Sequence, residues 1–216
     1  MKTESPAQPR QFLLKVLSYG NHYYIKRIAK LEAVLARAPR LLQIDLMGVG
    51  EIPADAALLI RSIVRARSPA TQIITNARSS LQGGSVLVWL LGDRRIIRDD
   101  ARVYFRRANP SEDDEADQAD AWKQAEPNYC DSFSETDPEE GDYQRVLELI
   151  NEFLPVKELA GRLLGVPVLR QFGLVDNEQL DQFLASALGK PPESKVEPRR
   201  EPESGRTSIE FKGRRT

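Results

Sequence analysis

Short apolar runs alternate along the first half of the chain with stretches in which apolar residues recur at helical spacing. Residues 41–47, 72–75 and 103–105 are rich in leucine, β-branched or aromatic residues, which predicts three buried strands. Residues 24–37 and 54–63 each carry an apolar stripe with the period of a helix. Strands that alternate with helices of this length predict an α/β fold of repeated βαβ units with a mostly parallel sheet and flanking helices.

A third helical stretch differs from these two. Residues 85–91 are apolar almost all round, which predicts a helix in the middle of the domain. This stretch follows Gly83 and Gly84, where the backbone is free to turn sharply. Two later stretches, residues 143–154 and 179–188, again carry apolar positions at helical spacing.

The composition predicts one domain with a tail at each end. A chain of 216 residues, 41% of them hydrophobic, is long enough for one α/β core. We expect a flexible N-terminus over residues 1–10 and a single domain over residues 11–189. Within that domain, residues 111–142 are rich in Asp, Glu, Ser, Pro and Gly, which predicts an acidic insertion or a poorly ordered loop. Residues 190–216 lack periodicity, which predicts a disordered C-terminal tail.

The charge of the chain is segregated, although the net charge is only −1. Residues 1–110 hold 18 basic and 8 acidic residues, a net charge of +10. Residues 111–142 hold one lysine and 13 acidic residues, a net charge of −12. This distribution predicts an acidic exposed element beside a mildly basic body. The basic residues form no recognised nucleic-acid-binding motif, so we expect no nucleic-acid partner.

The cysteine content and the apolar runs indicate the compartment. The single cysteine, Cys130, permits no intrachain disulfide, so a reducing cytosol is the default location. The first ten residues lack the apolar core of a signal peptide, and the longest apolar run, residues 86–91, is too short to cross a bilayer. We therefore expect a cytoplasmic protein without membrane association, and we expect neither a metal nor a cofactor.

Three segments, in this order, resemble the proteolytic subunit of the Clp protease and the wider ClpP/crotonase superfamily. They are Ile-Asp-Leu-Met-Gly-Val-Gly at residues 44–50, Leu-Gln-Gly-Gly-Ser-Val-Leu-Val-Trp-Leu-Leu at residues 81–91 with the strand 101–106 after it, and Arg-Leu-Leu-Gly-Val-Pro at residues 162–167, which runs into Gly-Leu-Val-Asp at residues 173–176. The resemblance spans about residues 12–188. It implies a ClpP/crotonase-like fold.

The resemblance also implies where a reaction would take place. It puts Ser85 at the nucleophile position, at the start of the buried helix, where backbone N–H groups stabilise a developing oxyanion. The oxyanion turn would comprise Gly48, Gly50 and Val86, although Glu51 beside this turn would oppose a forming negative charge. Without the resemblance, Ser85 at this position is typical of a helix N-cap.

The residues that would activate the serine are replaced. The resemblance puts Arg106 where the family has its catalytic histidine, and Lys157 at about the position of its aspartate. A guanidinium group cannot accept the proton of a serine hydroxyl. The only histidine, His22, lies in the first helical stretch, and no motif brings it to Ser85. The resemblance therefore implies a degenerate triad.

Three functional hypotheses remain open at this point. The first is a catalytically inactive Clp-protease-like pseudoenzyme that acts as a structural or regulatory subunit, in a homo-oligomer or in a mixed ring with Clp-like subunits. The second is a serine peptidase in which Ser85 forms a dyad with a lysine base, Lys123 or Lys157. The third is a crotonase-type acyl-CoA-binding protein, with Glu51 as the carboxylate beside the oxyanion hole. A protein partner that binds the C-terminal tail is compatible with each of them.

Overall fold

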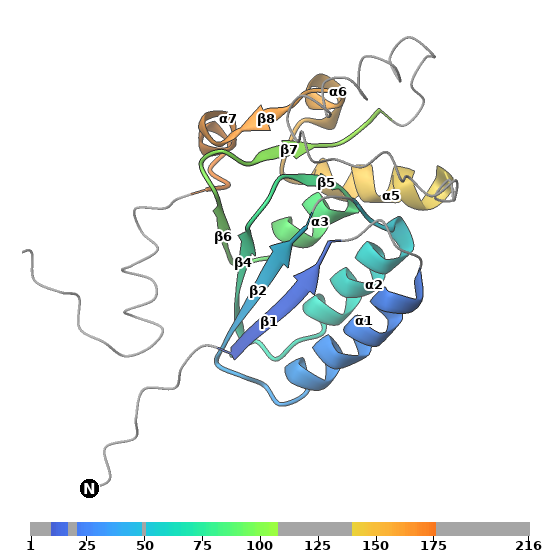
Figure 1. Ribbon diagram of the computed structural model, residues 1–216, viewed down its shortest axis with the longest axis vertical. Helices are drawn as coiled ribbons and strands as arrows, with labels where there is room; N and C mark the ends of the chain where they lie inside the picture. Colours follow the sequence, from blue (N-terminus) through green and yellow to red (C-terminus); the bar gives the residue numbers. More distant parts are fainter. Residues whose placement is uncertain (1–9, 17–20, 49–50, 108–139, 176–216) are drawn as a thin grey trace, which may run out of the picture.

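The computed structural model describes residues 10–16, 21–48, 51–107 and 140–175 of the chain. These residues form two four-stranded sheets that are joined and covered by helices (Figure 1). The predicted α/β fold with mostly parallel sheets and flanking helices is therefore confirmed. The acidic insertion from residue 111 to 139, the helix predicted over residues 179–188 and both tails lie outside the described residues.

The first sheet, which we call sheet A, is parallel throughout. Its strands are β1 (Arg10–Lys15), β2 (Leu41–Met47), β4 (Gln72–Ala77) and β6 (Arg94–Ile97), in the order β1-β2-β4-β6. The two central strands were predicted from the sequence, and β2 has the predicted bounds. The two edge strands were not predicted, because exposed or partly exposed charged and polar residues interrupt their apolar positions. Charged side chains are usual on edge strands, where they discourage pairing with another chain.

The second sheet, sheet B, is made of short strands. It comprises β3 (Glu51–Ile52), β5 (Leu81–Gly83), β7 (Arg102–Tyr104) and β8 (Leu164–Gly165), in that order, and only β8 is antiparallel to its neighbour. Strands of two or three residues show no sequence periodicity, so only β7 was predicted. Each of β3, β5 and β7 continues a strand of sheet A toward its carboxyl end, which brings the turns between the two sheets together.

The longer helices pack against one another beside the sheets. They are α1 (Asn21–Leu35), α2 (Ala54–Arg65), α3 (Gly84–Leu90) and α5 (Glu140–Ile150), followed by the short α6 (Val156–Leu159) and α7 (Val166–Gln171). Figure 1 shows α1 and α2 side by side along one side of β1 and β2, with α3 at the centre and α5 beside it. The region predicted as a loop up to residue 142 ends earlier, because α5 already begins at Glu140.

The central helix α3 is buried on every side, as its all-apolar sequence predicted. Trp89, which is 0% exposed, donates its indole N–H to Ile96 O at 3.0 Å, and its own carbonyl oxygen accepts from Thr75 Oγ1 at 2.6 Å. These contacts connect α3 to β6 and β4. The position of α3 fixes the turn between Gly83 and Ser85, from which the candidate site is built.

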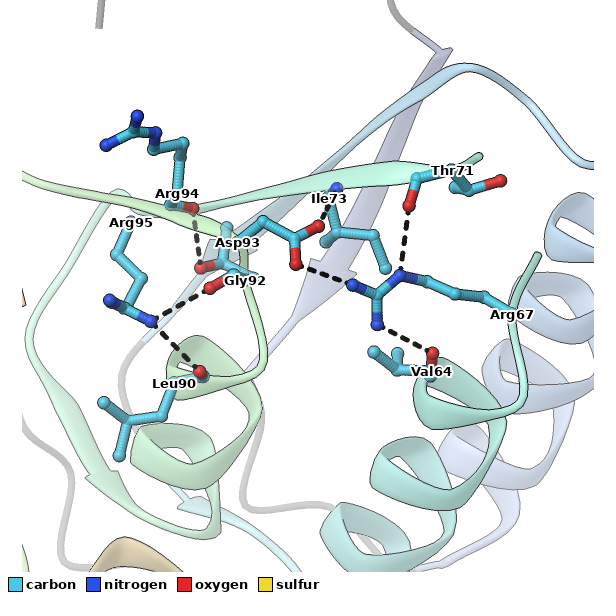
Figure 2. A network of polar contacts seen from close by, with 10 residues as sticks. Val64, Arg67, Thr71, Ile73, Leu90, Gly92, Asp93, Arg94 and Arg95 are labelled. Atoms are coloured by element: carbon cyan, nitrogen blue, oxygen red, sulfur yellow. Dashed lines mark hydrogen bonds and ion pairs between the residues drawn. The ribbon is translucent and has the colours of Figure 1, made fainter. Parts of the chain in front are cut away.

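A polar network fixes the opposite end of this helix layer (Figure 2). Arg67, which follows α2, donates to Val64 O and Thr71 O at 3.1 Å each, and its Nη2 lies 2.6 Å from Asp93 Oδ1. The other oxygen of Asp93 accepts the backbone N–H of Ile73 at 2.7 Å. Asp93 therefore joins the end of α2 to the start of β4.

Candidate functional site

Ser85 lies at the second position of α3, and its side chain is completely buried. Its Oγ accepts the backbone N–H of Ile52, on β3, at 3.0 Å. The hydroxyl therefore ties α3 to sheet B. The interpretation of Ser85 as an N-cap is wrong, because the N-cap residue is Gly83, with φ 50° and ψ −119° and no side-chain capping bond. A side chain is strained in that backbone conformation, which glycine adopts readily.

The carboxyl group of Glu51 fills the space above Gly83. A Cβ atom added to Gly83 would lie 1.6 Å from Glu51 Oε1. The same oxygen accepts the backbone N–H of Gly84 at 3.0 Å. The parallel register of β3, β5 and β7 explains this approach, since Glu51 pairs with Gln82, and Gln82 pairs with Tyr104. These three side chains form one row on the same face of sheet B.

Burial dominates the electrostatics of this row. It raises the pKa of Glu51 above its ordinary value, while the hydrogen bond from Gly84 and the charge of Arg106 lower that pKa by less. Burial also raises the pKa of Tyr104 and, beside it, of Tyr143 on α5. The Glu51 carboxyl therefore holds its proton to a higher pH than an exposed glutamate does, and both phenols stay protonated at neutral pH.

Arg106 is held at this cluster by Tyr143. Its guanidinium carbon lies 4.4 Å from the centre of the Tyr143 ring, and its backbone N–H donates to Tyr143 Oη at 3.0 Å. Within the described residues, two buried polar atoms here have no hydrogen-bond partner, Arg106 Nε and Gln82 Oε1. The Arg106 cation therefore lies against the Tyr143 ring and interacts electrostatically with the buried Glu51 carboxyl.

Among the remaining predicted site residues, Val86 directly follows Ser85 in the chain. Lys157 is exposed on α6, and Val86 is buried in α3. Gly48 donates its N–H to Ser79 Oγ at 3.1 Å and accepts from the same hydroxyl at 2.7 Å, so this part of the expected oxyanion turn is already hydrogen-bonded. Lys123 and Gly50 lie outside the described residues.

His22, the only histidine of the chain, belongs to α1, and its side chain lies outside the described part of the structure. Among the described residues, no group of three or more His, Cys, Asp or Glu side chains is arranged to hold a metal ion. No helix of the described part is both long enough and apolar enough to cross a membrane.

Sequence reasoning missed the other members of the cluster. Gln82 and Tyr104 stand inside the segments that carry the resemblance but were given no role, and Tyr143 is 37 residues away from its partner Arg106 along the chain. The alternation of polar residues with buried Leu81, Gly83, Val103 and Phe105 was the one signal for the row on sheet B. This alternation can be recognised as a row of polar side chains only when the register of the strands is known.

Comparisons with known proteins give a fold-level likeness. No family model matches the chain, and no curated protein matches it. Among solved structures, the chain is similar to a ClpP1 mutant from Listeria monocytogenes, with 14% sequence identity and a TM-score of 0.46 over 77% of this chain and 88% of that chain. The strand order, the register and the cluster around Glu51 define the class: an α/β protein of two mostly parallel sheets with a buried polar cluster on sheet B.

Proposed function

We propose that this chain is a catalytically inactive Clp-protease-like protein that serves as a structural or regulatory subunit of an oligomer. One observation carries the proposal. The hydroxyl of Ser85 is completely buried and accepts the N–H of Ile52, while the neighbouring Gly84 N–H is occupied by the carboxyl group of Glu51. The serine and the amide next to it are both engaged inside the protein.

The groups near Ser85 are poorly suited to acyl transfer. A serine becomes nucleophilic when a neighbouring base takes its proton. Tyr104 and Tyr143 have a pKa raised by burial, and the guanidinium group of Arg106 has no lone pair to accept a proton. Burial also raises the pKa of Glu51, which favours its neutral acid form, and its Oε1 is engaged by Gly84 N–H. An oxyanion at Gly84 would also have to displace the carboxyl oxygen of Glu51. The arrangement stabilises the contact between α3 and sheet B instead.

Exposed apolar side chains support the role as a subunit. Ile25 on α1 is 60% exposed and Leu59 on α2 is 48% exposed, and these two helices pack against each other. Contiguous exposed apolar side chains mark protein contact surfaces, and we propose that Ile25 and Leu59 belong to one such surface. The segregated charge of the sequence offers a second source of contact, since the basic body of one copy attracts acidic residues of another.

Light scattering coupled to size-exclusion chromatography tests the assembly. We expect a defined oligomer for the natural chain and a smaller species for Ile25→Asp combined with Leu59→Asp. Ala33→Asp, at another exposed position of α1, is the matched control and should leave the mass unchanged. A monomer at every concentration, both alone and mixed with a Clp-like subunit, would contradict the role as a subunit.

A crotonase-type acyl-CoA site is the second candidate, because one observation favours it. Glu51 is a buried carboxyl group with a raised pKa, hydrogen-bonded to a backbone amide at the turn before α3. Such a group can exchange a proton with a bound thioester whose carbonyl oxygen takes over the Gly84 N–H. Calorimetric titration with an acyl-CoA distinguishes this candidate from the inactive subunit. Heat of binding that is present in the natural chain and lost in Glu51→Gln would favour the acyl-CoA site. No contact of the described residues favours a Ser85–lysine dyad, which stays a prediction.

A further inference from the structure

One face of sheet A lacks a covering layer among the described residues. Helices α1, α2 and α3 lie against the face formed by Leu42, Ile44, Leu46 and the residues in register with them. The opposite face, which we call the outer face, consists of the alternate residues of the four strands: Gln11, Leu13, Lys15, Leu41, Gln43, Asp45, Met47, Gln72, Ile74, Asn76, Arg94 and Ile96, with Arg78 just after β4. Parallel sheets are almost always covered on both faces, so a layer is expected here.

The burial of the outer face is uneven. Ile74 is 0% exposed and Leu41 is 4% exposed, although neither belongs to the main core cluster under the helices. On the same face Leu13 is 37% exposed and Met47 is 38% exposed. Each of the four strands therefore contributes at least one apolar residue to the outer face, although the register row from Leu13 to Ile96 passes through Asp45 and Asn76.

The polar residues of the outer face give it a positive charge. Asp45, 3% exposed, accepts three hydrogen bonds at Oδ1, from Gln43 Nε2 at 3.0 Å, Asn76 Nδ2 at 2.7 Å and Arg78 Nε at 3.1 Å. Its charge is thereby neutralised. Lys15 and Arg94 add two further positive charges at the rims, so the three cations and one carboxylate of the face leave a net charge of +2.

The chain leaves the described part of the structure at the edge of this sheet. Arg95 on β6 donates its Nε to Leu174 O at 3.0 Å, and Leu174 and Val175 are both buried. Strand β6 is an edge strand of sheet A. This contact lies on the helix-covered side of β6, because Arg95 is in register with Thr75. Residues 176–188 would have to pass round this one edge strand to reach the outer face.

The sequence of the next thirteen residues complements that face. Residues 176–188 carry three acidic residues and no basic residue, and their apolar positions 180, 183, 184 and 187 recur at helical spacing. A helix of this length measures about 20 Å, at about 1.5 Å per residue. Four strands span about 14 Å from first to last, at about 4.8 Å per spacing. One such helix is long enough to cross the sheet.

We propose that residues 176–188 pack across the outer face of sheet A of the same chain. Leu180, Phe183 and Leu184 cover the apolar rows, and the acidic residues lie toward the cations at the rims. This inference is independent of the proposed function, because it concerns the face of sheet A that points away from α3 and Ser85.

Thiol labelling of the full-length chain tests the proposal. Ile74→Cys in a Cys130→Ser background places a single thiol on the outer face, and the maleimide labelling rate is measured under native conditions. Leu180→Asp with Phe183→Asp should raise that rate at least about tenfold, because the burial of two large apolar side chains is lost. Ile209→Asp with Phe211→Asp, farther along the tail, is the matched control and should leave the rate unchanged. If the Ile74→Cys chain does not fold, Leu13→Cys places the single thiol on the outer face instead.

Two outcomes overturn the proposal, and a third thiol controls for unfolding. An unchanged rate in the Leu180→Asp/Phe183→Asp chain would mean that residues 176–188 do not cover this face. Protection that grows with protein concentration and ignores those substitutions would assign the face to a second copy. Ile60→Cys, on the helix-covered side of the core and 1% exposed in the natural residue, reports global unfolding. An equal rise at that thiol would show that the substitutions unfold the protein rather than uncover one face.

Discussion

Replacing Ser85 by alanine should destabilise the protein if the hydroxyl has a structural role. The hydroxyl is the acceptor for the Ile52 N–H, both residues are 0% exposed, and the bond is 3.0 Å long. Ser85→Ala leaves that buried N–H without a partner, which costs about 1–3 kcal/mol of unfolding free energy. For a chain of this size the expected fall in melting temperature is about 2–4 °C per kcal/mol.

The assay is urea denaturation followed by circular dichroism at neutral pH. Ser62→Ala is the matched control, since Ser62 is an exposed helical serine whose hydroxyl donates to Leu58 O. It corrects for the higher helix propensity of alanine and should change the unfolding free energy by less than about 0.5 kcal/mol. Catalytic residues commonly lower stability, so removing one is often neutral or stabilising. A Ser85→Ala chain as stable as the natural chain, or more stable, would refute the structural reading.

Three further predictions concern polar contacts to the backbone and the turn before α3. Burial raises the pKa of Glu51 in the folded chain. The stability that its neutral carboxyl group contributes is therefore complete below the unfolded-state pKa and is lost as the pH rises through the folded-state pKa. Glu51→Gln should abolish this pH dependence, which is measured as the urea midpoint across a series of pH values. Gly83→Ala should be strongly destabilising because its Cβ meets the Glu51 carboxyl and its φ is 50°, and a double-mutant cycle with Glu51→Ala should recover about 0.5–3 kcal/mol of that loss. Asp93→Ala should cost about 1–3 kcal/mol in the same assay because the N–H of Ile73 loses its acceptor, whereas the exposed Asp100→Ala should change stability by less than about 0.5 kcal/mol.

The central elements of the fold were predictable because their sequences show burial directly. Strand β2 has six buried or half-buried residues in a row, and α3 has no polar face, so each sequence is compatible only with a position in the interior of the fold. Strands β1 and β6 were not predictable in the same way. They lie at the edges of sheet A, where Arg10, Lys15 and Arg94 are compatible with solvent and hide the apolar alternation.

The candidate site was only half predictable for a related reason. Ser85 and the glycine turn stand together in the sequence, so their joint position was clear. The contact of Glu51 with Gly84 depends on the register of two-residue and three-residue strands, which no periodicity specifies. Tyr143 reaches Arg106 from a helix that follows residues 108–139, and only tertiary packing brings the two together.

Labelling with a serine-reactive fluorophosphonate is the most direct test of the central claim that Ser85 is a buried structural hydroxyl. The natural chain, Ser85→Ala and Glu51→Gln are incubated with the probe, and the mass of each intact chain is measured. We predict no adduct on any of the three, because the hydroxyl is buried and accepts the Ile52 N–H, and no base lies among its contacts in the described residues. An adduct on the natural chain that disappears in Ser85→Ala would contradict the account.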